Sequence, residues 1–209
     1  MTNARVLICG LLCGLGLLLG AGATWADARA EVYAAWDAMV AAGKYRTHIE
    51  ATAMGQHYQQ TIEIALPDRV RVEGGPGGDL VITPDGGWMR LPGEAWTEAP
   101  QSTRELSKLF LSADYLQQSK DGVQAVSALP AERLGGRSVR VYRIEQTMTV
   151  LKVQSSNTIT LYVDALSGRP LRQIIEAEAA GQHSHTVQDI EYPDTLDIVP
   201  PVLGKGADG

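Results

Sequence analysis

Apolar residues recur at every second position through most of the chain, and two stretches show helical spacing instead. From residue 65 to residue 91 apolar and polar residues alternate, and glycine and proline interrupt the pattern. A period of two predicts antiparallel strands that turn one face to a core and the other to water. Strands are predicted at residues 45–54, 58–66, 69–73, 80–82, 88–91, 96–97, 123–129, 138–148, 158–164, 171–178 and 186–191. In the strand at 138–148 the apolar parity changes between Val141 and Tyr142, which predicts a β-bulge there.

The two helical stretches flank the first group of strands. The first begins near Asp27, repeats apolar residues at Val32, Trp36 and Met39, and ends at Gly43, a residue suited to the left-handed end of a helix. The second is predicted from Thr103 to about Ser112, with an extension through Gln118. Ser102 and Glu105 have the spacing of a capping box at its start.

The order of these elements favours one fold class. Helix, antiparallel strands, helix and antiparallel strands predict an α+β domain, because a long sheet with one apolar face must curl and be covered. We expect a curved antiparallel sheet that forms an incomplete β-barrel. The N-terminal helix and a mid-chain lid helix would cover its concave face.

The N-terminus resembles a targeting segment. Arg5 precedes an apolar run from Val6 to Leu19, and small residues follow, with Thr24 and Ala26 suitably placed for cleavage after Ala26. We therefore predict a signal peptide at residues 1–26, one domain at 27–198 and a disordered tail at 199–209. Cleavage two residues later, or a retained membrane anchor, are the alternatives.

Composition removes several classes of function. The only cysteines, Cys9 and Cys13, lie in the predicted signal peptide, so disulfides, thiolate nucleophiles and cysteine-bound metals are excluded from the exported chain. The formal net charge is −6, from 18 basic and 24 acidic residues. An acidic chain with dispersed arginines does not favour nucleic-acid binding, which needs a basic patch.

Candidate catalytic residues are few. His183 and His185 could place two imidazoles on one strand face, but no third metal ligand is evident, and His48 and His57 are predicted to lie in solvent. The chain has no nucleophile elbow and no glycine-rich loop leading into a helix. We predict no metal, no cofactor and no enzymatic activity. A hydrolase that uses paired carboxylates is the remaining catalytic alternative.

The apolar face of the sheet is the other candidate site. If two helices do not fill a curved sheet, the remaining apolar surface forms a cavity suited to an apolar ligand. An ordinary filled core is the alternative.

A resemblance to a known family bears on this choice. The stretch "ALPDRVRVEGGPGGDLVITPDGGWMRLPGEAW" resembles the outer-membrane lipoprotein carrier (LolA-like) superfamily, through Pro67, Arg69, Arg71, the Asp85–Gly86 turn and Trp88. "LYVDALSGRPLRQ" and "LDIVPP" are similar to later segments of these proteins. The "PDRVRVE" stretch is also similar to a related periplasmic family of unknown function. The similarity extends over nearly all of the chain after the signal peptide.

The resemblance implies a periplasmic protein that holds acyl chains of a lipid or lipoprotein, with no cofactor. Acyl chains would displace the lid helix from the sheet. Two features depart from the carrier: Leu66 replaces an arginine before the proline, and the chain has one phenylalanine. The alternative is therefore a non-enzymatic envelope sensor or adaptor for a protein partner. The predicted ligand-contacting residues are Ile49, Ile62, Ile64, Leu66, Val70, Val72, Leu80, Ile82, Trp88, Ile159, Leu161 and Val163 on the sheet, and Leu106, Leu109 and Phe110 on the lid.

Overall fold

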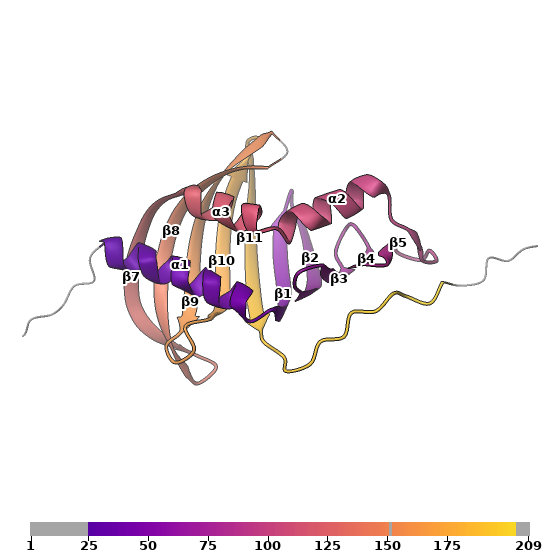
Figure 1. Ribbon diagram of the computed structural model, residues 1–209. Helices are drawn as coiled ribbons and strands as arrows, with labels where there is room; N and C mark the ends of the chain where they lie inside the picture. Colours follow the sequence, from indigo (N-terminus) through magenta and orange to yellow (C-terminus); the bar gives the residue numbers. More distant parts are fainter. Residues whose placement is uncertain (1–24, 151, 204–209) are drawn as a thin grey trace, which may run out of the picture.

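The alternating segments pair into one antiparallel sheet of eleven strands (Figure 1). The structure is a computed structural model, and it describes residues 25–150 and 152–203. The strands are β1 (Lys44–Ala53), β2 (Gln56–Ala65), β3 (Arg69–Gly74), β4 (Asp79–Thr83), β5 (Gly86–Arg90), β6 (Thr97–Glu98), β7 (Val123–Leu134), β8 (Arg137–Val150), β9 (Val153–Asp164), β10 (Pro170–Ala179) and β11 (Gln182–Glu191). The helices are α1 (Trp25–Ala41), α2 (Gln101–Phe110) and α3 (Ala113–Asp121).

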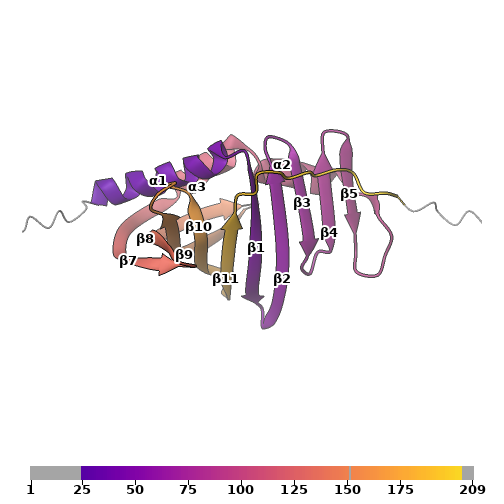
Figure 2. The same cartoon turned by 90° about the horizontal axis from the view of Figure 1, so that it is seen from below.

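The strand order is β6-β5-β4-β3-β2-β1-β11-β10-β9-β8-β7. The chain therefore runs outward from β1 to β6, crosses back through α2 and α3 to the opposite edge, and returns to place β11 beside β1. The sheet curves most at the β7–β9 end and is flatter from β2 to β5 (Figure 2). It does not close into a barrel, so the predicted fold class, an incomplete antiparallel barrel with helices on one face, is confirmed.

Helix α1 fills the more strongly curved half of the concave face. Val32 and Trp36 of α1 belong to one buried cluster with Ile144 and Leu161 of the sheet, and neither Ile144 nor Leu161 retains exposed area. Gly43 ends this segment with φ of 72°, as the sequence predicts. Among the described residues, no helix combines the length and the apolarity needed to cross a membrane.

The predicted β-bulge in β8 is wrong. Strand β8 pairs with β9 without interruption, so there is no bulge between Val141 and Tyr142 on that side. These neighbours face opposite sides of the sheet and both are buried, which produces the change of parity. The irregularities lie in β7 instead, where the register with β8 shifts between Val123 and Ala125 and again between Leu129 and Glu132.

The predicted capping box at the second helix does not form. Helix α2 begins at Gln101, so Ser102 lies inside it, and Glu105 accepts a hydrogen bond of 2.7 Å from the side chain of Gln101. A genuine cap starts the next helix, where the hydroxyl of Ser112 accepts a hydrogen bond from the backbone N–H of Tyr115. The predicted extension to Gln118 is thus the separate helix α3.

The convex face of β1–β3 is covered, which the sequence does not predict. Glu63, expected in water, is 8% exposed and pairs with Arg46 at 2.6 Å and with Arg71 at 3.0 Å. Arg71 and Arg69, also expected in water, are half-buried and donate to the backbone carbonyls of Asp197 and Ile198. These contacts hold the C-terminal segment against the sheet.

This C-terminal segment, residues 192–203, has no regular secondary structure and runs from β1 toward β5 (Figure 2). We call it the strap. Lys44 of β1 donates to its Asp194 carbonyl at 2.6 Å, and its Ile198 side chain is 1% exposed. Residues 199–203 continue it; disorder beyond Ile198 stays a prediction, and residues 204–209 lie outside the described part of the chain.

Replacing Ile198 by alanine should lower the free energy of unfolding by about 2–4 kcal/mol, because a buried isoleucine loses its packing. Val202→Ala is the matched control in the same segment, since Val202 is 92% exposed and should change stability by less than about 0.5 kcal/mol. Urea unfolding followed by circular dichroism measures both. Equal stability of the two variants would mean that the strap does not pack on the sheet.

Candidate functional site

All charged side chains of β1–β5 project from the same face of the sheet. The pairing register puts Thr47, Ile62, Val72 and Leu80 on the same face, which is the face toward the helices. No Asp, Glu, Lys, Arg or His of these five described strands projects from that face, because each occupies the alternate position. The concave face of β1–β5 is therefore an uncharged surface, and we refer to it as the apolar face.

The apolar face is less completely covered than the half beneath α1. Thr47, Ala51, Val70, Ile82 and Gly87 are buried, but most of the large apolar side chains on the same face are half-buried. Beneath α1, in contrast, Leu161 and Val163 have no exposed area. The half-buried members of the apolar face are Tyr45, Ile49, Ala53, Tyr58, Gln60, Ile62, Ile64, Val72, Leu80 and Met89.

The predicted ligand-contacting residues divide into four groups. Ile49, Ile62, Ile64, Val70, Val72, Leu80 and Ile82 lie together on the apolar face, and Leu66 follows directly after β2. Ile159, Leu161 and Val163 are on the same side of the sheet but belong to the buried cluster beneath α1. Leu106, Leu109 and Phe110 lie on α2, and their side chains are outside the described part of the structure. The fourth group is Trp88 alone.

Trp88 lies on the opposite face of the sheet from the other predicted residues. It pairs with Val81, whereas Leu80 pairs with Met89 and Ile82 pairs with Gly87. The turn between β4 and β5 sets this register, so Met89 rather than Trp88 faces the helices. The prediction grouped Trp88 with its neighbours by side-chain type; the register fixed by the turn is what assigns its face.

Helix α2 approaches the apolar face at a glycine. A methyl group added at Gly87 would lie 2.7 Å from Cγ of Arg104 and 2.7 Å from Cδ1 of Ile82. Gly87 thus provides the space in which the alkyl part of the Arg104 side chain meets β5. This close approach places α2 over the outer strands of the apolar face, where Figure 1 also shows it.

Neutral polar groups that were not predicted from the sequence occupy the middle of the concave face. Gln173 of β10 donates to Gln188 of β11 at 2.5 Å, and both are half-buried. Nearer β8, Asn157 donates to Gln146, which in turn donates to the Ser119 carbonyl at the end of α3. Side-chain alternation along the strands could have identified these residues, because Gln173 projects from the same face as Ile175, and Gln188 projects from the same face as Ile190.

Burial also affects the tyrosines at one end of the concave face. Burial raises the pKa of Tyr45 to about 12. Burial likewise raises the pKa of Tyr192, whose hydroxyl donates to the Pro170 carbonyl at 2.8 Å. Both phenols therefore stay neutral at physiological pH, and this end of the concave face carries no phenolate charge.

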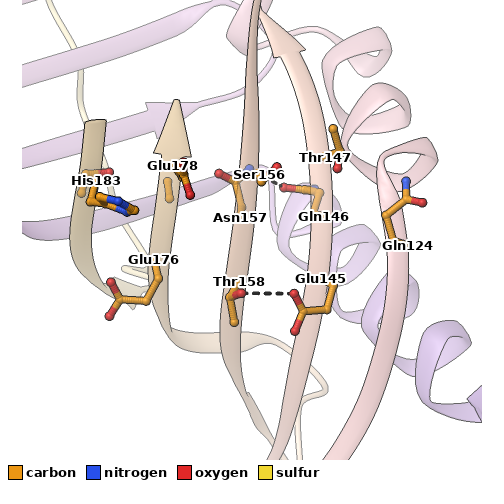
Figure 3. A pocket seen from close by; sticks show the side chains of 12 residues that line it. Gln124, Glu145, Gln146, Thr147, Ser156, Asn157, Thr158, Glu176, Glu178 and His183 are labelled. Carbon is orange, nitrogen blue, oxygen red and sulfur yellow. Dashed lines mark hydrogen bonds between the residues drawn. The ribbon is translucent and has the colours of Figure 1, made fainter. Parts of the chain in front are cut away.

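A polar groove of about 430 Å³ lies on the side of β8–β11 away from the helices (Figure 3). His185 and Glu176 approach to 2.5 Å beside it, and Glu145 accepts hydrogen bonds from Arg143 and Thr158. Alternation places the carboxylates of Glu145, Glu176 and Glu178 on this outer face. The groove is lined by Gln124, Glu145, Gln146, Thr147, Ser156, Asn157, Thr158, Glu176, Ala177, Glu178, His183 and Ser184. Four of these residues, Gln146, Asn157, Ala177 and Ser184, project toward the helices and border the groove from within the strands.

The groove has the residue types for proton transfer but lacks other features of a catalytic centre. His183 and His185 do share a strand face, as the sequence suggested, and each lies opposite a glutamate, Glu178 and Glu176 respectively. Within the described residues, no cluster of three or more His, Cys, Asp or Glu side chains could hold a metal ion. Glu176, Glu178, His183 and His185 are all exposed, so they do not have the water-excluded surroundings that activate a catalytic acid or base.

Comparison with known proteins supports the fold. The lipoprotein LppX of Mycobacterium tuberculosis superposes with a TM-score of 0.54 at 14% identity, over 84% of this chain and 100% of LppX. LprF of Mycobacterium bovis gives 0.54 at 11% identity, over 88% of this chain and 100% of LprF. No protein-family model matches the sequence, and no curated protein matches it. The fold that the resemblance to LolA-like proteins implies is therefore confirmed.

Gly87→Ala should displace α2 from the apolar face, because the added methyl group would overlap both Arg104 and the buried Ile82. We expect a loss of about 1–3 kcal/mol in unfolding free energy and faster proteolytic cleavage within residues 101–110. Gly77→Ala is the matched control, since nothing lies within 4 Å of a methyl group added there. If both variants are cleaved at the wild-type rate, α2 does not depend on this contact.

Proposed function

We propose that the protein binds the acyl chains of a lipid, a lipoprotein or a similar amphiphile on the apolar face, beneath α2. The observation that carries this proposal is the contrast between the two halves of the concave side. Beneath α1, Ile144, Leu161 and Val163 have no exposed area, whereas Ile62, Val72 and Leu80 remain half-buried although no charged side chain of β1–β5 lies on their face. An uncharged, incompletely covered surface of this kind favours an apolar ligand.

The amides at the middle of the concave side favour an amphiphile over a pure hydrocarbon. Gln173 and Gln188 bind each other, and their remaining amide donor and acceptor atoms can bind an ester or amide group of a ligand. Apolar strands on one side of this pair would hold the chain, and the amides would orient its neutral polar part. A charged head group would remain at the solvent-exposed margin, because burying a charge without a partner is costly.

The proposed mechanism is reversible exchange of apolar surfaces. Helix α2 covers the apolar face in the absence of ligand, and each methylene that an acyl chain buries contributes about 0.8 kcal/mol toward moving the helix. No bond is made or broken, so the proposal requires neither a cofactor nor a catalytic residue. The predicted signal peptide and the fold shared with the lipoprotein LppX support a periplasmic location.

Lipid extraction from protein purified from its own host, followed by mass spectrometry, should recover a bound amphiphile. Ile62→Asn should weaken binding of an apolar fluorescent probe by about tenfold, because it places an amide against the ligand. Thr61→Asn is the matched control, since Thr61 is the preceding residue of β2 and projects from the opposite face. It should bind the probe like the wild type.

Two outcomes would contradict the proposal. One is a protein that is reproducibly free of lipid and does not bind the probe. The other is equal probe binding by Ile62→Asn and Thr61→Asn. If cross-linking in cells then captured one protein partner and no lipid, the adaptor alternative would replace the carrier.

A further inference from the structure

The alkyl stem of Arg104 on α2 lies against the apolar face. Its Cγ and Cδ atoms are 2.7 Å and 2.8 Å from the position of a methyl group added at Gly87, which is buried. The guanidinium follows directly after Cδ, so it remains close to β5. Gly87 pairs with Ile82 on the face toward the helices, and β5 lies next to the short edge strand β6. The guanidinium is therefore at the outer margin of the apolar face.

Arg104 differs from the other arginines because its guanidinium has no partner among the described residues. Within residues 25–150 and 152–203, every other arginine binds a carboxylate or a backbone carbonyl, except Arg169, which lies over the ring of Tyr192. Arg104 is half-buried, yet its side chain forms no hydrogen bond, ion pair or ring contact with any residue in these ranges. A cation that loses part of its hydration without gaining a partner is unfavourable. The missing partner is therefore one that comes from outside the chain.

The carboxylates of the neighbouring segments do not neutralise Arg104. Glu105, the next residue of α2, accepts a hydrogen bond from the side chain of Gln101. Glu98 of β6 pairs with Trp88 and thus projects from the opposite face of the sheet, and Asp85 is exposed in the β4–β5 turn. None of these three carboxylates forms an ion pair with Arg104. The margin of the apolar face beneath α2 therefore carries an uncompensated positive charge.

We infer that Arg104 binds the anionic group of the ligand, a carboxylate or a phosphate, while the acyl chain lies on the apolar face. A guanidinium presents its N–H donors in a planar arrangement that fits two oxygens of either anion. The inference rests on the proposed function, and it narrows the ligand to an amphiphile with a negatively charged end.

The apolar side chains beside Arg104 continue across the sheet. Met89, Leu80, Val72 and Ile62 pair in succession from β5 to β2, and all four are half-buried. This row begins two residues along β5 from Gly87, where the stem of Arg104 crosses the strand. The distance from β5 to β1 is four strand spacings, about 19 Å, which suits a long acyl chain. The Gln173–Gln188 pair lies beyond β1, so the amides would meet a neutral polar group at the far end of the chain.

Displacement of a neutral apolar fluorescent probe tests the inference with three ligands that share one alkyl chain: hexadecanol, palmitate and hexadecyl phosphate. The wild-type protein should bind both anions about tenfold more tightly than hexadecanol. Arg104→Met retains an apolar stem over Gly87 and removes the charge, so it should bind both anions about tenfold more weakly and hexadecanol like the wild type. A wild-type preference for one of the two anions would identify the head group as a carboxylate or a phosphate.

Lys108→Met is the matched control, because it removes an exposed positive charge from the same helix, one turn away. It should change the affinity for all three ligands by less than about twofold, since an exposed charge is screened by solvent. Both variants should unfold at the wild-type urea concentration.

Three results would overturn the inference and leave the proposed function standing. They are wild-type binding of hexadecanol as tight as that of the anions, a preference for anions that survives in Arg104→Met, and an equal loss of that preference in Lys108→Met. Failure of all three ligands to displace the probe from the wild type would overturn both.

Discussion

The sorting of charged side chains to one face of β1–β5 is the constraint on which the candidate site depends. A strand places successive side chains on opposite faces, so a shift of register by one residue would bring Arg71 and Glu63 under the helices. The observed register keeps every charge of these strands outside and leaves an uncharged inner surface. The half-buried inner surface is a candidate site only because no charged side chain of these strands lies on it.

The outer face is not simply solvated. Glu63 lies between Arg46 and Arg71, and both Arg69 and Arg71 donate hydrogen bonds to strap carbonyls. A buried carboxylate between two cations has its charge and its hydrogen bonds satisfied, which a single arginine partner would achieve less completely. The same strands therefore present the candidate binding surface on one face and bind the C-terminal segment on the other.

Much of this arrangement could be predicted from alternation alone. Period two located the sheet, and the predicted strands are present, because side-chain burial follows strand geometry directly. Contacts between distant segments could not be predicted in this way. Neither the contact of the strap with Arg69 and Arg71 nor the place of Gln173 beside Gln188 has a local signal, since each joins segments that are distant in the sequence or depends on which strands become neighbours. The face from which Trp88 projects could not be predicted either, because the turn before it sets the register of its strand. Whether α1 would fill the concave side, as it does at Leu161, also depends on where the helix crosses the sheet.

The central ladder of the sheet joins the two ends of the chain. Arg46 pairs with Glu191, which is 145 residues later (191 − 46), whereas every other ladder of the sheet links strands that follow each other in sequence. Closing the nearest pair of this ladder, Ala53 with Ser184, involves 131 residues (184 − 53) and costs about 3 kcal/mol more in chain entropy than closing a hairpin of four. The two halves can therefore form as local meanders, and their joining must wait until the last strand has left the ribosome. Until β11 is complete, the two half-sheets lack the one ladder that joins them.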